Sequence, residues 1–226
     1  MCEILAIRWA QPRSFGEILP WAIELEKLGI AGFGWGAAWR TIEGHLEIYK
    51  SLGRLQDDTS GQEQLRDVHA DRFLVHLRRP SMLSTVQEAD TQPFLAADGS
   101  FAFSHNGLLE RSEDLRPRFA EHLQGAGDSE VAFQLLSREL LPALAPGEAL
   151  ADLHRQMGGE ANLVYFPATG DPWIYGGHRT NPMWTFRIGD GHAAATALHS
   201  ADDSLFRLIF AAAEERRPVG ETPVYL

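Results

Sequence analysis

The sequence predicts an α+β fold in which stacked mixed sheets are covered by helices. Short apolar stretches typical of strands occur in clusters, and stretches with helical periodicity lie between these clusters rather than after each strand. No G-x-G-x-x-G or G-x-x-x-x-G-K-[ST] motif follows a predicted strand. A dinucleotide-binding or P-loop architecture is therefore excluded.

The composition of the chain limits its expected domain number, binding partners and cellular compartment. The chain has 226 residues, of which 44% are hydrophobic and 23% charged, and this fits one globular domain, residues 1–226. The formal net charge of −11 repels polyphosphate, so nucleic acid and anionic membranes are poor partners. No segment approaches the ~18 consecutive apolar residues of a membrane span. The N-terminus does not match a signal peptide, and a single cysteine cannot form an internal disulfide. We therefore expect a cytoplasmic protein.

The first predicted unit is a strand followed by a helix. Residues 4–7 are an apolar run without breakers, which suits a strand buried on both faces. Ser14 and Glu17 have the spacing of a capping box, and Gly29 is a natural helix stop. Pro20 argues against a helix that starts so early, and is typical of a first turn instead.

Later elements follow the same criteria. Strands are expected at residues 33–39 and 45–50, paired as a hairpin, and at 72–77, 101–105, 161–166, 173–175 and 192–198. Helices are expected at residues 129–141 and 204–215, and a polar loop at 57–61. Asn106 and Gly107 should form the turn that ends the strand at 101–105. Asp128 stands at an N-cap position, and Pro142 and Pro146 should end the helix that follows.

Cys2 combines two groups that covalent catalysis needs. Initiator methionine is usually trimmed before a small residue, and trimming would leave Cys2 with both a thiol and a free α-amine. Their reference pKa values are about 8.5 and about 8. The amine can therefore take the thiol proton, directly or through one water. The alternative is that Cys2 is an ordinary small apolar residue at the start of a strand.

Six short motifs occur in order along the first part of the chain. They are Met1-Cys2-Glu3, Gly32-Phe33-Gly34-Trp35-Gly36, His76-Leu77-Arg78, Gln92-Pro93-Phe94, Phe103-Ser104-His105-Asn106-Gly107 and Gly127-Asp128-Ser129-Glu130. Together they resemble the class II glutamine amidotransferases, most closely the small stand-alone members. The resemblance implies the N-terminal-nucleophile hydrolase fold, a four-layer αββα sandwich of two stacked, mostly antiparallel sheets.

The resemblance also implies catalytic or substrate-binding roles for five of the matching residues. Cys2 would attack the γ-amide, while the Asn106 side chain and the Gly107 backbone N–H would form the oxyanion hole. Arg78 would hold the substrate α-carboxylate with two parallel hydrogen bonds, and Asp128 would hold the α-ammonium. The alternatives are a plain hairpin turn, a solvated surface arginine and a helix N-cap without a ligand.

Four further residues are expected to support the site. His76 and His105 occupy strand or turn positions beside it, with direct proton transfer as the less favoured reading. Gly34 and Trp35 are expected to pack beside the nucleophile, with Trp35 in the core. The nine histidines show no H-E-x-x-H spacing, and one cysteine cannot build a thiolate zinc site. We therefore expect no metal site and no cofactor.

The expected reaction is cleavage of a γ-glutamyl amide through a γ-glutamyl thioester. Two versions stay open: a free-standing hydrolase of γ-glutamyl amides or peptides, and a glutaminase subunit that supplies ammonia to a separate synthetase. The chain departs from the family where Arg78 is followed by Arg79-Pro80-Ser81-Met82, and where Gln92 precedes Pro93-Phe94. These departures leave the leaving-group side undetermined and favour the hydrolase.

Other readings come from different classes of protein. A catalytically silent binding or regulatory subunit would keep the fold, and a papain-like Cys–His hydrolase would place its cysteine at a helix start. Residues 145–226 carry no assigned motif, although 181–183 and 197–200 loosely resemble late strands of stand-alone members. The sequence leaves a homo-oligomer open.

Overall fold

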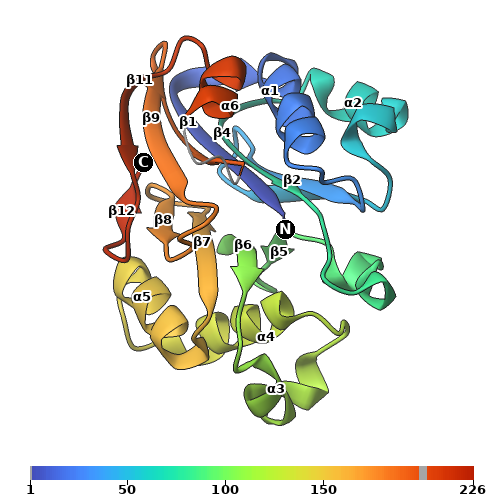
Figure 1. The fold of residues 1–226 in the computed structure, drawn as a ribbon, viewed down its shortest axis with the longest axis vertical. Helices are drawn as coiled ribbons and strands as arrows, with labels where there is room; N and C mark the ends of the chain where they lie inside the picture. Colours follow the sequence, from blue (N-terminus) through green and yellow to red (C-terminus); the bar gives the residue numbers. More distant parts are fainter. Residues whose placement is uncertain (1, 199–202) are drawn as a thin grey trace.

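Two stacked antiparallel sheets lie between two layers of helices (Figure 1). This computed structural model describes residues 2–198 and 203–226. The expected removal of Met1, and positions 199 and 200 of the late motif, therefore lie outside the described residues. The four-layer α+β prediction is confirmed.

One sheet has seven strands in the order β11-β9-β10-β1-β4-β2-β3, and the other has five in the order β12-β8-β7-β6-β5. The strands are β1 (Glu3–Ser14), β2 (Trp35–Arg40), β3 (Leu46–Ser51), β4 (His69–Leu77), β5 (Phe94–Leu95), β6 (Phe101–Leu108), β7 (Glu160–Pro167), β8 (Trp173–Gly176), β9 (Met183–Ile188), β10 (Gly191–Thr196), β11 (Glu214–Pro218) and β12 (Val224–Tyr225). The helices are α1 (Phe15–Leu28), α2 (Thr59–Arg66), α3 (Ser112–Leu115), α4 (Asp128–Leu135), α5 (Pro146–Met157) and α6 (Ser204–Ile209).

The first strand and helix form as their sequence predicts. β1 is buried on both faces because it pairs with β4 on one side and β10 on the other. α1 begins after Ser14, whose capping box with Glu17 is formed, and it ends at Gly29. Pro20 lies inside the helix, so the early start is correct and the argument against it is wrong. Pro20 is the sixth residue of α1, just past the first turn, so it removes a single backbone hydrogen bond near the start of the helix.

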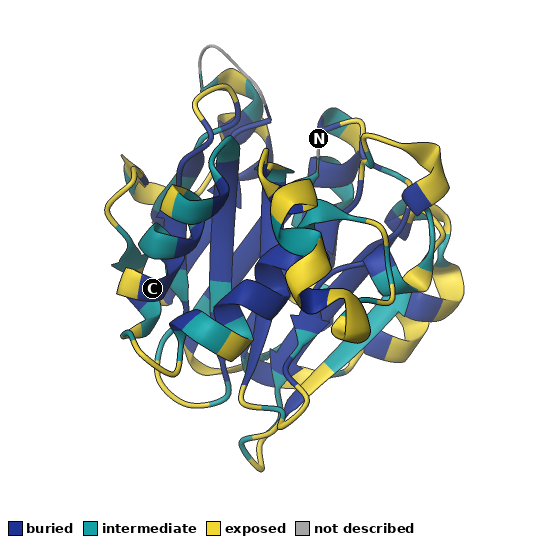
Figure 2. Cartoon of the chain, turned by 90° about the horizontal axis from the view of Figure 1, so that it is seen from below, coloured by how far each residue is buried: buried dark blue, intermediate teal, exposed yellow. Residues whose placement is uncertain are grey.

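Three apolar layers hold the four structural layers together. One fills the space between α1, α2, α6 and the seven-stranded sheet, and another lies between the five-stranded sheet and α4 and α5. The middle layer joins the two sheets, and Figure 2 shows the strands dark blue and buried between the more exposed helices. Its members include the small residues Ala6, Ala38, Ala102 and Ala194 and the larger Phe166. Small side chains on facing strands let the two sheets approach closely.

The predicted turn at Asn106 and Gly107 is wrong. Both residues belong to β6, where Asn106 pairs with Asn162 and Gly107 with Ala161 of β7. An Asn-Gly pair is typical of turns only when no ladder partner is available, and β7 supplies one. Gly107 has a φ of 133°, a conformation open to glycine that distorts the strand locally without ending it.

Other expectations also differ from the structure where long-range packing decides. The last helix ends at Ile209, and residues 214–218 form the edge strand β11 beside β9, which was not predicted. The loop expected at residues 57–61 contains Asp58, which caps α2. Pro146 begins the unpredicted helix α5. The predicted hairpin is confirmed, because β2 pairs with β3.

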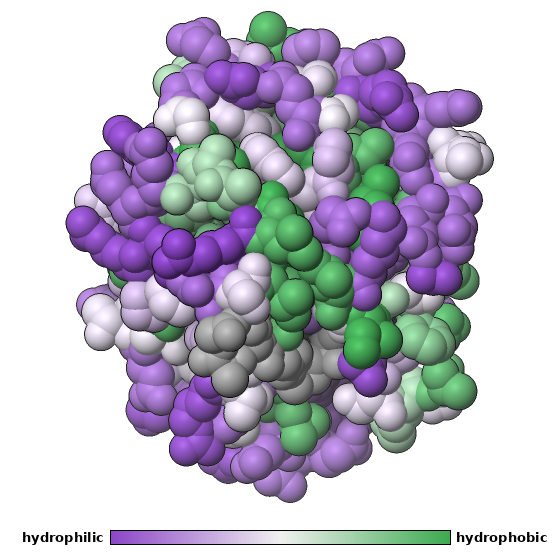
Figure 3. All heavy atoms as spheres, turned by 45° about the horizontal axis from the view of Figure 1, so that its top comes forward, coloured by the Kyte–Doolittle hydropathy of each residue, from purple (hydrophilic) through white to green (hydrophobic). Residues whose placement is uncertain are grey.

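The surface is largely hydrophilic on the face in Figure 3, where hydrophobic residues gather in a central patch. Among residues 2–198 and 203–226, no helix combines the length and the apolar character that crossing a membrane requires.

Replacing Phe166 by Ala should test the layer between the sheets. Phe166 is fully buried there, so the change should lower the free energy of unfolding by about 3–5 kcal/mol. Urea denaturation measures this, with Ile42→Ala as the control because Ile42 is 88% exposed. Equal effects of the two substitutions would contradict the assigned layer.

Candidate active site

Cys2 directly precedes the central strand β1 of the seven-stranded sheet. The residue is half-buried, and its Sγ accepts a hydrogen bond from the backbone N–H of Arg79 at 3.4 Å. Burial raises the pKa of the thiol to about 11, although the Arg79 N–H and the nearby Arg78 guanidinium lower it in part. The thiol is therefore neutral near pH 7 and needs an adjacent base before it can act as a nucleophile.

Asn106 and Gly107 approach Cys2 from the other sheet. Asn106 is fully buried, and its side-chain Nδ2 donates a hydrogen bond to the carbonyl oxygen of Cys2. Any Cβ at position 107 would collide with the carbonyl oxygen of Glu160, so only glycine fits there. Two potential donors therefore lie beside the thiol, the Asn106 amide and the Gly107 backbone.

Arg78 directly follows β4, whose end neighbours the start of β1. Its backbone N–H donates to the carbonyl of Gly34 at 2.8 Å. Its guanidinium donates to the carbonyl oxygen and the hydroxyl of Thr85 and to the carbonyl oxygen of Gln87. Burial lowers the pKa of Arg78. The side chain thus fixes the loop of residues 82–87 beside Cys2.

Asp128 is the first residue of α4, and Gly127 takes the N-cap position that was expected for Asp128. One carboxylate oxygen of Asp128 accepts from the Leu109 backbone N–H at 2.9 Å, and the other from the Ser129 hydroxyl at 3.2 Å. The carboxylate therefore ties the start of α4 to the chain that leaves β6.

His76 and His105 are both buried and neutral. His76 Nε2 lies 3.3 Å from the carbonyl oxygen of His105, and His105 Nδ1 lies 2.9 Å from the Ser129 hydroxyl. Burial lowers the pKa of His76 to about 3 and also lowers that of His105. The side chain of Gln92 accepts a hydrogen bond from the backbone N–H of His105 and donates one to its backbone carbonyl, as a neighbouring strand would. These contacts hold the backbone and side chains around the cavity in place, which is consistent with a supporting role for both histidines.

Trp35 packs in the apolar layer on the helix side of the sheet, and Gly34 directly precedes it at the start of β2. Gly34 has a φ of 115°, and its carbonyl holds the backbone of Arg78. Trp35 is fully buried, stacks on Phe15 and donates from Nε1 to Asp58 at 3.0 Å. Trp35 is therefore a core residue and Gly34 is a backbone contact of the site.

A cavity of about 380 Å³ brings most of the predicted site together. The residues of interest in its wall are Cys2, Arg78, Gln92, His105, Gly107 and Asp128. The loop that follows Arg78, residues 79–82, forms another part of the wall. Asn106 lies behind the wall, in contact with Cys2.

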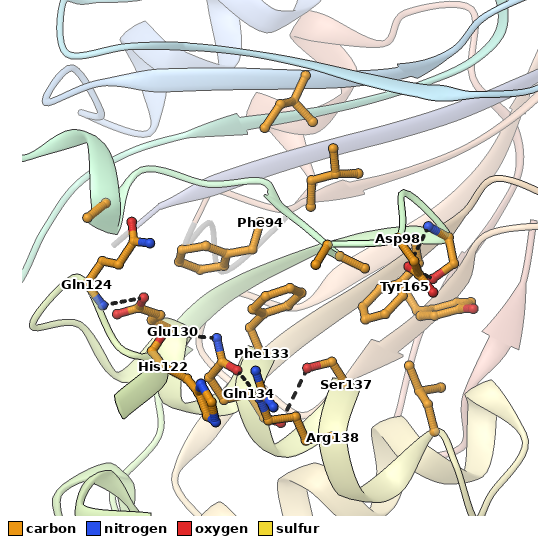
Figure 4. Close-up of a pocket in the computed structure, with 18 of the residues that line it drawn as sticks. Phe94, Asp98, His122, Gln124, Glu130, Phe133, Gln134, Ser137, Arg138 and Tyr165 are labelled. Carbon is orange, nitrogen blue, oxygen red and sulfur yellow. Dashed lines mark hydrogen bonds between the residues drawn. The ribbon is translucent and has the colours of Figure 1, made fainter. Parts of the chain in front are cut away.

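A larger cavity of about 790 Å³ lies next to this one and contains none of the predicted catalytic residues (Figure 4). In the close-up, the rings of Phe94 and Phe133 stack at its centre, and Glu130 reaches toward Gln124. The turn at residues 124–127 separates the two cavities. Asp90 and Glu130 hold this turn by accepting its backbone N–H groups.

Three residues of the site were not predicted. Asn162 and Glu3 are fully buried beside Asn106 and Cys2, and Gln92 was noted only as a departure from the family pattern. The available signal for Asn162 was a polar residue at the second position of the otherwise apolar strand predicted at residues 161–166. In the described part of the chain, no group of three or more His, Cys, Asp or Glu residues could hold a metal ion.

Two known proteins have sequences similar to that of this chain. The chain is 32% identical over 149 residues to an amidophosphoribosyltransferase of Methanocaldococcus jannaschii, covering 61% of this chain and 31% of that protein. It is 30% identical over 122 residues to a glutamine–fructose-6-phosphate aminotransferase of Lactiplantibacillus plantarum, covering 50% of this chain and 19% of that protein. The chain therefore spans less than a third of these relatives. No protein-family model matches it.

Solved structures agree on the architecture. The glutamine phosphoribosylpyrophosphate amidotransferase of B. subtilis superposes with a TM-score of 0.69 at 16% identity, covering 100% of this chain and 44% of that chain. This chain has the fold of the class II glutamine amidotransferases. A class-II glutamine aminotransferase domain protein from Silicibacter pomeroyi gives a TM-score of 0.60 at 20% identity, with 86% and 88% coverage. A predicted glutamine amidotransferase from Pseudomonas aeruginosa gives 0.57 at 16% identity, with 99% and 96% coverage. The amidotransferase fold therefore accounts for the whole described chain.

The Glu3 carboxyl should make stability depend on pH. Burial raises its pKa to about 7, although hydrogen bonds from Thr196 and Asn181 lower it in part. The folded state then favours the protonated form, so Glu3 lowers the stability of the native state increasingly as pH rises from about 4.5 to about 7. Glu3→Gln cannot ionise, and it should gain about 3 kcal/mol over wild type between about pH 4 and pH 8. Unfolding titrations at several pH values measure this, and a pH-independent difference would contradict it.

Proposed function

We propose that this chain hydrolyses γ-glutamyl amides, with Cys2 as the nucleophile. The observation that carries the proposal is the single cavity that Cys2, Arg78, Gly107 and Asp128 share, with the Asn106 amide on the carbonyl of Cys2. A thiol, donors for an oxyanion, a guanidinium and a carboxylate match the parts of a γ-glutamyl amide. The similarity to an amidophosphoribosyltransferase and to a glutamine–fructose-6-phosphate aminotransferase supports the same class of reaction.

The first step needs a base at the nucleophile itself. The buried neutral histidines are poor bases, since burial lowers the pKa of both. In the proposal, removal of Met1 leaves an α-amine on Cys2, and this amine accepts the thiol proton. The thiolate then attacks the γ-carbonyl carbon, and the carbonyl oxygen becomes an oxyanion held by Asn106 Nδ2 and the Gly107 N–H.

The remaining steps return the enzyme to its starting state. The ammonium of Cys2 gives its proton to the leaving nitrogen, the C–N bond breaks, and ammonia or an amine departs. The carbon now forms a thioester with Cys2. Water attacks this thioester with the α-amine as base, which releases the γ-carboxylate and the free thiol. The balance requires no cofactor.

Arg78 and Asp128 are proposed to hold the other end of the substrate. A guanidinium matches a carboxylate with two parallel hydrogen bonds, and the Asp128 carboxylate attracts the α-ammonium. Arg78 already fixes the loop of residues 82–87 through Thr85 and Gln87. Substrate binding and loop position are therefore linked through one side chain.

The leaving group distinguishes two versions of the proposal. The favoured version is a hydrolase of γ-glutamyl amides or peptides acting in the reducing cytoplasm. It is supported by the loop of residues 79–82, which departs from the synthetase-coupled pattern and lines the cavity. The second version supplies ammonia to a separate synthetase, as the names of the two curated relatives suggest. A catalytically silent subunit of this fold is the outcome if no γ-glutamyl compound is turned over.

Cys2→Ala should abolish turnover without unfolding the protein. Loss of the nucleophile should reduce kcat by at least ~10⁴-fold, whereas the change removes only one half-buried sulfur. Glutamate release from glutamine and from γ-glutamyl peptides measures activity, and thermal melting measures the fold. A folded Cys2→Ala protein with wild-type turnover would overturn the mechanism.

Arg78→Lys should weaken the binding of substrates that carry a free α-carboxylate. A lysine ammonium cannot reproduce the paired hydrogen bonds, so KM should rise about 10- to 100-fold. The matched control is the same γ-glutamyl substrate with its α-carboxylate converted to an amide, for which KM should stay close to the wild-type value. An equal loss on both substrates would show that Arg78 acts only by holding the loop.

A further inference from the structure

Three buried asparagines form a continuous chain of hydrogen bonds behind Cys2. Asn106 Nδ2 donates to the carbonyl oxygen of Cys2. Asn162 Nδ2 donates to Asn106 Oδ1 at 2.8 Å and to the backbone carbonyl of Asn181 at 2.7 Å. All three asparagines are 0% exposed. This row of hydrogen bonds joins β7 and the segment before β9 to the start of β1.

The direction of this chain is set at the Asn181 carbonyl. A backbone carbonyl only accepts hydrogen bonds, so Asn162 must turn its NH₂ group toward it. The same NH₂ group faces Asn106, which must then present its oxygen to Asn162 and its own NH₂ group to Cys2. A reversed Asn162 would place two oxygens face to face in a buried site, which costs the full desolvation penalty of both.

One feature of Asn162 supports this reading. Among the described residues, its Oδ1 atom has no hydrogen-bond partner although it is buried. In the orientation observed, both N–H groups of Asn162 Nδ2 form hydrogen bonds, whereas its Oδ1 forms none. Buried polar groups are nearly always paired, so the two acceptors, Asn106 Oδ1 and the Asn181 carbonyl, determine the orientation.

Asn181, at the far end of this row of hydrogen bonds, is also fixed relative to Cys2. Asn181 donates from its side chain to Glu3 Oε2 at 3.2 Å, and its backbone N–H donates to His178 Nδ1 at 3.2 Å. Glu3 is the first residue of β1 and directly follows Cys2. The carbonyl that orients Asn162 is thus held by the neighbour of the nucleophile.

We propose that Asn162 is a positioning residue that directs the Asn106 amide N–H toward the oxyanion formed at Cys2. This inference rests on the proposed function, because only an attack at Cys2 creates that oxyanion. The negative charge exists in the tetrahedral intermediate and not in the bound substrate. Loss of Asn162 should therefore lower kcat and leave KM nearly unchanged.

Two variants and one control separate orientation from folding. Asn162→Asp keeps the shape but, when ionised, cannot donate to either acceptor, and Asn162→Ala removes the contact without adding a charge. Ser104→Ala is the control, since Ser104 is buried in β6 two positions before Asn106 and its hydroxyl has no partner among the described residues. Where Asn162→Asp does not fold, Asn162→Ala decides the proposal.

The kinetic probes are a γ-glutamyl peptide, glutamate and glutamate γ-semialdehyde, which forms a tetrahedral adduct with a cysteine. Asn162→Ala should lower kcat about 10- to 100-fold, below the ~10²–10³-fold cost of losing one oxyanion donor entirely. The affinity for the semialdehyde should fall by a similar factor, and the affinity for glutamate should change by less than about twofold. Ser104→Ala should match wild type in all three. Wild-type kcat in Asn162→Ala, or equal losses of semialdehyde and glutamate affinity, would overturn the proposal.

A measurement without turnover keeps this test distinct from that of the function. Hydrogen exchange of the Asn106 side-chain amide, followed by ¹⁵N NMR, should be at least about tenfold faster in Asn162→Ala than in wild type. Unchanged exchange would overturn the positioning role even if the enzyme is active. A wild-type protein that turns over no γ-glutamyl compound would instead overturn the proposed function, whatever the exchange rates show.

Discussion

The hydrogen bond from the Asn106 amide to the carbonyl of Cys2 joins the two sheets at the point where the site forms. Cys2 directly precedes β1 of the seven-stranded sheet, and Asn106 belongs to β6 of the five-stranded sheet. Small residues such as Ala6 and Ala102 in the layer between the sheets favour their close approach. Stacking of the sheets, rather than any single loop, therefore brings the Cys2 thiol close to the proposed oxyanion donors.

Burial determines the protonation states around that contact. It raises the pKa of the Cys2 thiol to about 11, lowers that of His76 to about 3 and lowers that of His105. Near pH 7 the thiol and both imidazoles are therefore neutral. In the proposed mechanism, the base for the thiol is therefore a group on Cys2 itself. The α-amine that Met1 removal would expose on Cys2 meets this requirement, and it links activity to N-terminal processing.

The sequence predicted what local chemistry determines and missed what distant contacts determine. The capping box at Ser14, the hairpin of β2 and β3, and the motif residues of the cavity were all readable from short segments. The supposed turn at Asn106 became a strand because β7 pairs with it, 56 positions away at Asn162. The helix predicted at residues 204–215 runs into the start of β11, and the strand itself was missed because its pairing with β9 cannot be read from its charged sequence. Asn162 had a signal, a polar residue in an apolar strand, whose partner no local pattern could supply.

The intact mass of the protein, before and after incubation with an electrophilic diazo-ketone analogue of glutamine, tests the central claim most directly. The account predicts a chain that has lost Met1 and gains one adduct, mapped by peptide sequencing to Cys2. That result would join the nucleophile and the γ-glutamyl pocket in a single observation. An active protein that retains Met1, or an adduct that maps to another residue, would contradict it.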